Sequence, residues 1–208
     1  MKFGVKSVKK IKKKLIAQCI LLNDHRVFQQ TQQYSKVKTK MIQQGDVLPS
    51  GHLFVMGKGG PERVFTDDLF RGKTCVLFGL PGAFTSVCSS KQVPEYVAKK
   101  REFADMGIDH LFCLSVNDPY VMTAWAGGLV VLPDVVTFLS DPDGSFTKQM
   151  GLNQEVEGLG LRSRRFSALI SDRRVYVLNV DEPGGKTYKV SGPDFMLRIL
   201  DKAEKESR

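Results

Sequence analysis

The stretch TCVLFGLPGAFTSVCSSKQVP, residues 74–94, joins an apolar run to a turn and then to a cysteine. Residues 74–79 form a continuous apolar run rich in β-forming residues, which is typical of a central strand covered on both faces. A Pro-Gly pair ends the run, and apolar residues then recur at helical spacing over residues 89–106. The stretch therefore predicts a buried strand, a tight turn and a long amphipathic helix, with Cys88 where the helix begins.

The same alternation of strand and helix continues along the chain. The other expected elements are an edge hairpin within 45–63, a helical turn at 66–70 capped by Thr66, strands at 110–117 and 135–140, a helix over 120–126, a hairpin of strands at 166–171 and 175–180, and a final helix from Gly192. Such alternation implies right-handed crossovers and parallel strands, and the closing hairpin makes the sheet mixed. The expected fold is α/β and thioredoxin-like, with a central mixed, mostly parallel sheet flanked by helices.

The positive charge of the chain lies near its N-terminus. The 208 residues carry 31 Lys and Arg against 22 Asp and Glu, a net charge of +9. Residues 1–40 hold 11 of the basic residues and one acid, Asp24, which leaves 20 basic and 21 acidic residues, net −1, in the rest. The body of the protein therefore lacks the basic composition of nucleic-acid binders. We divide the chain into a basic extension, residues 1–42, and one domain, residues 43–208.

The basic extension has three readings. A mitochondrial presequence is favoured, because such segments are basic and poor in acids. A secretory signal would use the apolar residues 15–22, which are short for that purpose and far below the ~20 residues that span a bilayer. The third reading is a solvated basic arm that binds anionic surfaces, in which case the protein would be cytoplasmic.

The four cysteines, Cys19, Cys75, Cys88 and Cys113, do not form a metal-binding pattern. They contain no C-x-x-C spacing, and the chain has only 3 histidines, so neither a metal site nor another cofactor is expected. Free thiols indicate a reducing compartment. Cys75 and Cys113 lie inside apolar strands, where a cysteine is usually a small packing residue. Serines and a Pro-Gly turn flank Cys88, which we expect to be partly exposed.

The position of Cys88 favours thiol chemistry. Unpaired amides at a helix start stabilise an anion and lower the pKa of a thiol, and the thiolate is the nucleophile. Thr85 can place a hydroxyl beside the sulfur, and Pro81 bends the loop without adding an N–H group. The cluster RSRRF offers a cation, but its spacing does not choose among Arg162, Arg164 and Arg165.

The segment PGAFTSVCS resembles the peroxiredoxins through the pattern P-x-x-x-T-x-x-C at Pro81, Thr85 and Cys88. The segments VLFGLPGAF, LSVNDPYVMTAWA and GLRSRRFSALI are similar to the atypical type II group, which includes mammalian peroxiredoxin 5 and the plant type II enzymes. The resemblance covers roughly residues 45–200. It implies a peroxidatic Cys88, a Thr85 that orients peroxide, an Arg165 that stabilises charge, and a Pro81 that shields the pocket.

The resemblance also implies substrates and partners. The substrates would be hydrogen peroxide and alkyl hydroperoxides, in an antioxidant reaction that passes through a cysteine sulfenic acid. Glutaredoxin with glutathione, or thioredoxin, would return the sulfenic acid to thiol, and the protein would be a homodimer. Two other functions are a non-catalytic thiol redox sensor or relay, and a binding module that uses the basic extension.

The sequence departs from the family at two places. The late resolving cysteine of the mammalian form is missing, because the corresponding segment reads GGKTYKVSG. Cys113 matches a second cysteine of the plant enzymes and is a possible resolving residue, although a disulfide requires Cα atoms within about 7 Å. Four residues after the peroxidatic cysteine, the mammalian form has histidine and this chain has Gln92.

Overall fold

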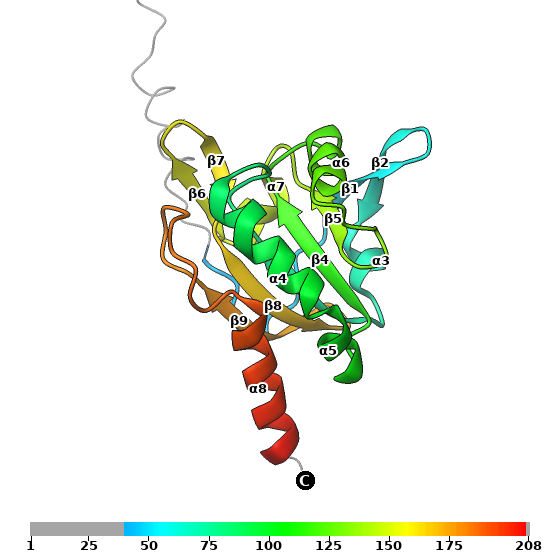
Figure 1. The fold of residues 1–208 in the computed structure, drawn as a ribbon, viewed down its shortest axis with the longest axis vertical. Coiled ribbons are helices and arrows are strands. Elements are labelled where there is room, and N and C mark those ends of the chain that lie inside the picture. The colour runs from blue at the N-terminus through cyan, green and yellow to red at the C-terminus, as the bar shows by residue number, and fades with distance from the viewer. Residues whose placement is uncertain (1–39, 207–208) are drawn as a thin grey trace, which may run out of the picture. The chain divides into compact units, whose positions relative to one another are not determined.

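A seven-stranded mixed sheet forms the centre of residues 40–206, the part of the chain that this computed structural model describes (Figure 1). Residues 1–39 of the predicted basic extension lie outside the described residues. The strand order is β2-β1-β5-β4-β3-β8-β9. The strands are β1 (His52–Gly57), β2 (Gly60–Phe65), β3 (Thr74–Gly79), β4 (His110–Ser115), β5 (Thr137–Ser140), β8 (Phe166–Ser171) and β9 (Arg174–Val180).

The three central strands are parallel and the outer strands are antiparallel. Strand β4 pairs in parallel with β3 on one side and β5 on the other, whereas β1, β2, β8 and β9 all join through antiparallel pairings. The predicted α/β, thioredoxin-like fold with a mixed sheet is confirmed. The sheet is less parallel than predicted, because a hairpin adds antiparallel strands at each edge.

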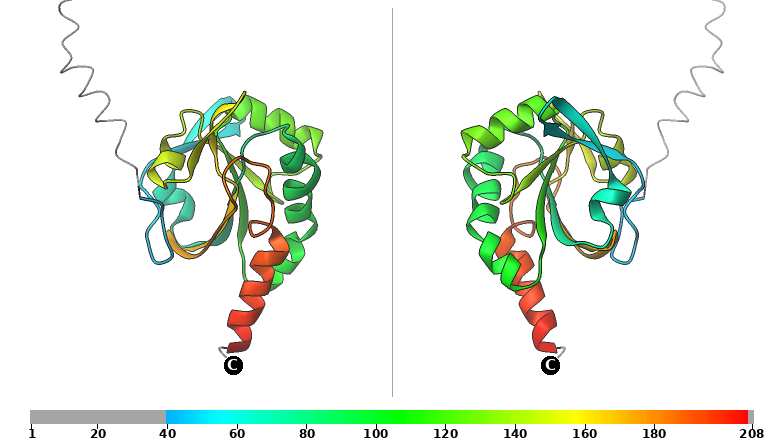
Figure 2. Two further views of the ribbon diagram at one scale, coloured as in Figure 1. Left: turned by 90° about the vertical axis from the view of Figure 1, so that its left-hand side faces the viewer. Right: turned by 90° about the vertical axis from the view of Figure 1, so that its right-hand side faces the viewer.

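Helices cover both faces of the sheet and create two apolar cores (Figure 2). They are α3 (Thr66–Phe70), η1 (Cys88–Gln92), α4 (Val93–Ala98), α5 (Lys100–Asp105), α6 (Pro119–Gly128), α7 (Ser145–Gln149) and α8 (Pro193–Glu206). Alternate side chains of a strand point to opposite faces. Cys75 and Leu77 of β3 therefore join α3 and α7 in the first core, and Val76 and Phe78 join the other helices in the second. Cys88 belongs to the second core.

Three features of the fold differ from the predicted elements. The predicted helix over 89–106 is broken into η1, α4 and α5, with Lys99 between the last two at φ −95° and ψ 5°. The element η1 is a π-helix, a rare form that occurs mostly as single turns within α-helices and is frequent at functional sites. Helix α7 and a separate small sheet of β6 (Asn153–Val156) and β7 (Gly160–Ser163) were not predicted.

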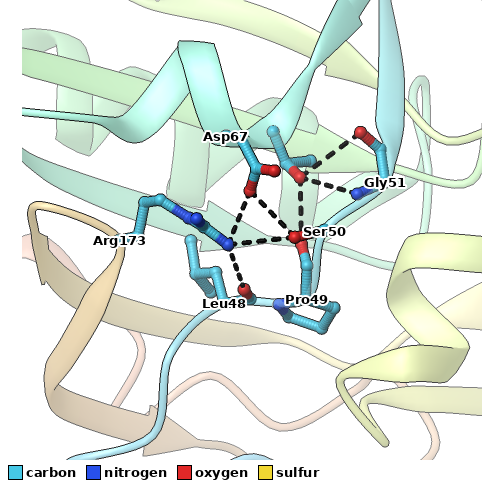
Figure 3. A network of polar contacts seen from close by, with 7 residues as sticks. Leu48, Pro49, Ser50, Gly51, Asp67 and Arg173 are labelled. Atoms are coloured by element: carbon cyan, nitrogen blue, oxygen red, sulfur yellow. Dashed lines mark hydrogen bonds and ion pairs between the residues drawn. The ribbon is translucent and has the colours of Figure 1, made fainter.

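Thr66 is buried at the start of α3 but does not cap the helix as predicted. The N-cap residue is Phe65, without a side-chain cap, and the Thr66 hydroxyl instead donates to the Pro49 carbonyl at 2.9 Å. Thr66 thus ties the segment before β1 to α3. Beside it, Asp67 accepts from Ser50 at 3.0 Å and pairs with Arg173 at 2.5 Å (Figure 3). These contacts join the turn between β8 and β9 to α3 and to the segment that precedes β1.

Gly79 ends β3 where there is no room for a side chain. A Cβ atom there would lie 2.0 Å from the ring of Phe166, which is fully buried beside it on β8. We expect Gly79→Ala to lower the free energy of unfolding by about 1–3 kcal/mol, because a buried ring and a strand must move apart. Urea unfolding followed by circular dichroism measures this change. Gly59→Ala is the control, since its Cβ meets nothing within 4 Å, and equal stability of the two variants would contradict the expectation.

Candidate active site

Cys88 lies at the carboxyl end of β3, after the loop of residues 80–87, as the first residue of η1. The expectation that it is partly exposed is wrong: its exposed fraction is 0%. Ser86 and Ser90 do face solvent, but Cys88 itself points into the second core. These two polar neighbours in the sequence are exposed, but they do not indicate that the Cys88 side chain points into the core.

A buried arginine contacts the sulfur. Arg165 precedes β8 and is 1% exposed, and its Nη1 donates to Sγ of Cys88 at 3.3 Å. No ion pair between this guanidinium and a carboxylate is found in residues 40–206, where the ion pairs involve other cations. Within the described residues the Cys88 sulfur therefore lies at hydrogen-bond distance from a cation that has no counter-ion.

Neutral groups satisfy the rest of the Arg165 guanidinium. Its Nε donates to the Thr187 carbonyl at 3.2 Å and its Nη2 to the Gly185 carbonyl at 2.8 Å. Nη1 also donates to Oε1 of Gln92, a fully buried side chain at the end of η1. Carbonyl dipoles stabilise the buried charge without cancelling it, so the positive field reaches Cys88.

The loop of residues 181–191 holds the carbonyls that Arg165 uses. The Asp181 carboxylate accepts from the backbone N–H groups of Lys189 and Val190, at 3.0 and 2.9 Å, and from the Ser191 hydroxyl at 2.6 Å. The ring of Tyr188 lies 5.7 Å from the Arg165 guanidinium, and the Tyr188 hydroxyl donates to Glu95 on α4. This loop therefore connects the arginine to the helix that follows the cysteine.

Thr85 and Pro81 lie in the loop ahead of Cys88. Thr85 is half-buried, and its hydroxyl donates to the Gly82 carbonyl at 2.9 Å, so its oxygen lone pairs are available to accept from a ligand. Pro81 is buried and in contact range of Gly185, whose added Cβ would lie 2.9 Å from the proline ring. The structure thus brings Cys88 and Arg165 into direct contact and places Pro81 and Thr85 in the adjoining loop.

Gln92, Gly185, Thr187 and Tyr188 belong to this site and were not predicted as site residues. The spacing of Gln92 from Cys88 carries a usable signal, because residues four apart on a helix lie on one face. The three others act mainly through backbone carbonyls or through a ring on a late loop. No local pattern indicates such a contact between distant segments.

Cys113 and Cys75 have environments that suppress thiolate formation. Cys113 lies on β4, fully buried in the same core as Cys88, and burial, with a smaller contribution from Cys88, raises the pKa of its thiol well above the usual range. Cys75 faces the opposite core, and burial raises the pKa of its thiol to about 12. Cys19 lies outside the described residues.

The burial of Cys75 and Cys113 predicts which thiols can be modified in the native protein. We expect iodoacetamide at pH 8 to leave Cys75 and Cys113 unmodified, and to modify both after denaturation, because burial raises the pKa of both thiols and so disfavours the reactive thiolate. Peptide mass spectrometry with and without guanidinium measures the difference. Native modification of either residue at the rate of a free thiol would contradict the prediction.

Two further features of the described residues bear on the kind of protein. Residues 40–206 contain no group of three or more His, Cys, Asp or Glu side chains that could hold a metal ion. Among the described helices, none has the length and apolar character needed to cross a membrane.

A thioredoxin-like sheet with a cysteine at a helix start and a buried arginine at its sulfur defines a thiol-based redox enzyme. The Redoxin family profile matches residues 43–192, and the chain belongs to this family. Within the family it is a peroxiredoxin of the plant type II and peroxiredoxin 5-like group, and therefore a thiol peroxidase with an antioxidant role.

Named relatives support this assignment. The chain is 41% identical to Peroxiredoxin-2B of Arabidopsis thaliana over 159 residues, covering 75% of this chain and 96% of the relative. It is 42% identical over 132 residues to Peroxiredoxin-2F, mitochondrial, of the same organism, covering 62% of this chain and 65% of the relative. Reduced Prx3 of Vibrio vulnificus in complex with H₂O₂ superposes with a TM-score of 0.73 at 37% identity, covering 77% of this chain and 99% of that one.

Proposed function

We propose that Cys88 is the peroxidatic residue of this peroxidase. Its thiolate attacks one oxygen of hydrogen peroxide or an alkyl hydroperoxide, so that an S–O bond forms as the O–O bond breaks. The cysteine is oxidised to the sulfenic acid, and the other oxygen leaves with the electron pair and takes a proton to become water or an alcohol. The observation that carries this proposal is the 3.3 Å contact between Arg165 and the Cys88 sulfur, two side chains that are both buried.

The neighbouring residues have separate roles in this proposal. Arg165 stabilises the thiolate and the negative charge that develops on the leaving oxygen. Thr85, with oxygen lone pairs free, accepts from the peroxide O–H and orients it for in-line attack. Pro81 adds no N–H group and keeps water from the loop beside Gly185.

A stopped-flow experiment tests the peroxidatic step. Trp125 is the only tryptophan of the sequence, and its indole N–H donates at 3.0 Å to Ser89, the residue next to Cys88. Reduced protein is mixed with one equivalent of hydrogen peroxide while fluorescence is recorded, and mass spectrometry locates the added oxygen. A fast signal with oxygen on Cys88 supports the proposal, whereas oxidation at the rate of a free thiol contradicts it.

The alternative of a non-catalytic sensor or relay predicts a different stoichiometry. A sensor consumes one equivalent of peroxide per Cys88 and stops, whereas a peroxidase consumes many when a thiol reductant is present. The contact of Arg165 with the sulfur, together with Thr85 and Pro81 in the adjoining loop, favours turnover. Peroxide consumption over many equivalents distinguishes the two.

We propose that an external thiol, from glutaredoxin with glutathione or from thioredoxin, recycles the enzyme. The incoming thiol attacks the sulfenic sulfur, which releases water and leaves a mixed disulfide, and a second thiol then reduces that disulfide to Cys88 thiol. The burial of Cys113 on β4 supports this route over an internal one. Each reductant is assayed with wild type and with Cys113→Ser, and loss of turnover in the variant would make Cys113 the resolving residue instead.

Assembly and location complete the proposal. Two exposed aromatic rings support a homodimer that docks around the active site: Phe84 in the active-site loop and Tyr120 on α6. Analytical ultracentrifugation tests this assembly.

The basic extension, residues 1–42, together with relatives named as mitochondrial, supports a mitochondrial leader over a cytoplasmic protein. Sequencing the N-terminus of the protein from cells shows whether the segment is removed.

A further inference from the structure

Gln92 occupies an unusual position in the site. It is fully buried, and its amide lies between the Arg165 guanidinium and the end of β3. The hydrogen bond across η1, from the Val93 N–H to the Cys88 carbonyl, widens this turn and brings Gln92 to the same side as Cys88. A buried polar side chain at this depth requires partners, and both of its amide ends have one.

The two partners fix which way the amide points. Nε2 of Gln92 donates to the Gly79 carbonyl at 3.4 Å, and Oε1 accepts from Nη1 of Arg165. The same Nη1 donates to the Cys88 sulfur, so its two hydrogens are divided between sulfur and amide oxygen. The amide thus fixes the nitrogen that contacts the sulfur, and it anchors that nitrogen to the central strand.

We infer that Gln92 is a positioning residue for the peroxidatic reaction, acting as an uncharged acceptor that directs Nη1 of Arg165 to the Cys88 sulfur. This inference rests on the proposed roles of Cys88 and Arg165. An acceptor without charge holds the cation in place and leaves its full charge for the thiolate. A carboxylate at the same place would hold the cation equally well and cancel most of its field.

The surroundings contain few groups that titrate near neutral pH. Those that the structure places around Cys88 and Gln92 are Arg165, Cys113, Tyr96 and the Tyr188–Glu95 pair. Burial raises the pKa of Cys113, Tyr96 and Tyr188, with Glu95 adding to the rise for Tyr188, so these three stay neutral through the physiological range. A glutamine adds no titrating group of its own to these surroundings.

Three substitutions separate position from charge. Gln92→Met removes the acceptor and Gln92→Glu makes it negative. Both are expected to slow the reaction with peroxide about tenfold at neutral pH and to shift the rate–pH profile to higher pH, because the sulfur loses a positioned, uncompensated cation. Gln92→His restores a neutral acceptor, so it is expected to react like wild type at high pH. It loses rate as the pH falls through the imidazole pKa, which is about 6.5 when unperturbed and lower beside a cation.

The experiment is the rate of peroxide reaction from pH 5 to pH 9 for wild type, the three variants and Tyr96→Phe. Tyr96 is an equally buried residue on α4 whose hydroxyl donates to the Ser191 carbonyl, so Tyr96→Phe loses a hydrogen bond in the same core and keeps the wild-type pH profile. The inference is overturned if Gln92→Met or Gln92→Glu shows the wild-type dependence of rate on pH. It is also overturned if Gln92→His reacts slowly at every pH. Wild type reacting no faster than a free thiol refutes the proposed function instead. If Gln92→Met does not fold, the glutamate and histidine variants decide.

Discussion

Replacing Cys88 with serine is expected to abolish the rapid reaction with peroxide, by more than about 10³-fold, because a hydroxyl is not ionised at neutral pH and neither other thiol of residues 40–206 is hydrogen-bonded to a cation. In the proposed mechanism the Arg165 guanidinium, 3.3 Å from the sulfur, stabilises a thiolate, and it cannot ionise a serine. The variant should fold, since serine differs from cysteine at one atom and keeps an acceptor for Nη1 of Arg165. Stopped-flow mixing with hydrogen peroxide, followed by competitive assay where the signal vanishes, measures the loss.

Cys75→Ser and Cys113→Ser are the matched controls for this prediction. Both residues are as fully buried as Cys88, so the three substitutions impose a similar cost on packing. Neither control thiol contacts a cation in residues 40–206, and burial raises the pKa of both. They should therefore keep the fast step. A fast step that survives in Cys88→Ser, or disappears in Cys113→Ser, would move the reaction to another sulfur.

The position of Cys88 could be predicted from local sequence for a physical reason. An apolar run of six residues that favour β structure is buried on both sides, and β3 spans residues 74–79 as expected. A Pro-Gly turn then fixes where the chain leaves the sheet. Ligands of open α/β sheets bind at the carboxyl ends of the strands, so the order of strand, turn and cysteine predicts Cys88 at that edge.

Local sequence predicted neither the burial of Cys88 nor the break at Lys99. Cys88 contacts Arg165, 77 positions away in the chain, and the loop after β9 in turn accepts a hydrogen bond from Arg165. Helices α4 and α5 continue the same amphipathic pattern, so the change of direction between them leaves the hydrophobic spacing intact. Strands β6 and β7 are four residues each and largely polar, which gives no apolar periodicity to detect.

The choice among Arg162, Arg164 and Arg165 shows the same limit within one short motif. Arg162 donates to the Val116 carbonyl at 3.0 Å and Arg164 to the Asp181 carbonyl at 2.6 Å, whereas only Arg165 contacts the Cys88 sulfur. All three are arginines within four positions, so composition and spacing cannot rank them. The family resemblance pointed to Arg165, and the geometry places that residue at the sulfur.

Arg165→Lys is expected to slow the reaction with peroxide by about 10²–10³-fold, the usual effect of removing a charge-stabilising donor. A lysine keeps the positive charge but cannot reach the Cys88 sulfur while also donating to the carbonyls of Gly185 and Thr187, which the planar guanidinium does from three nitrogens. The rate constant for oxidation at pH 7 measures this loss. Arg164→Lys is the control, because Arg164 belongs to the same motif but donates to the Asp181 carbonyl and does not contact the sulfur.

Arg165→Met adds a second comparison, because it removes the charge as well as the geometry. Without the cation a negative sulfur loses the partner that stabilises it, so we expect the midpoint of the rate–pH profile to move to higher pH. If charge alone matters, Arg165→Lys keeps the wild-type midpoint and rate. If the position of the donor nitrogen matters too, as the hydrogen bonds from three guanidinium nitrogens indicate, Arg165→Lys is slow even at the high-pH end of the profile. A fast Arg165→Lys together with a slow Arg165→Met would show that only the positive charge of Arg165 matters. It would contradict the positioning role that we assign to Gln92 and to the loop of residues 181–191.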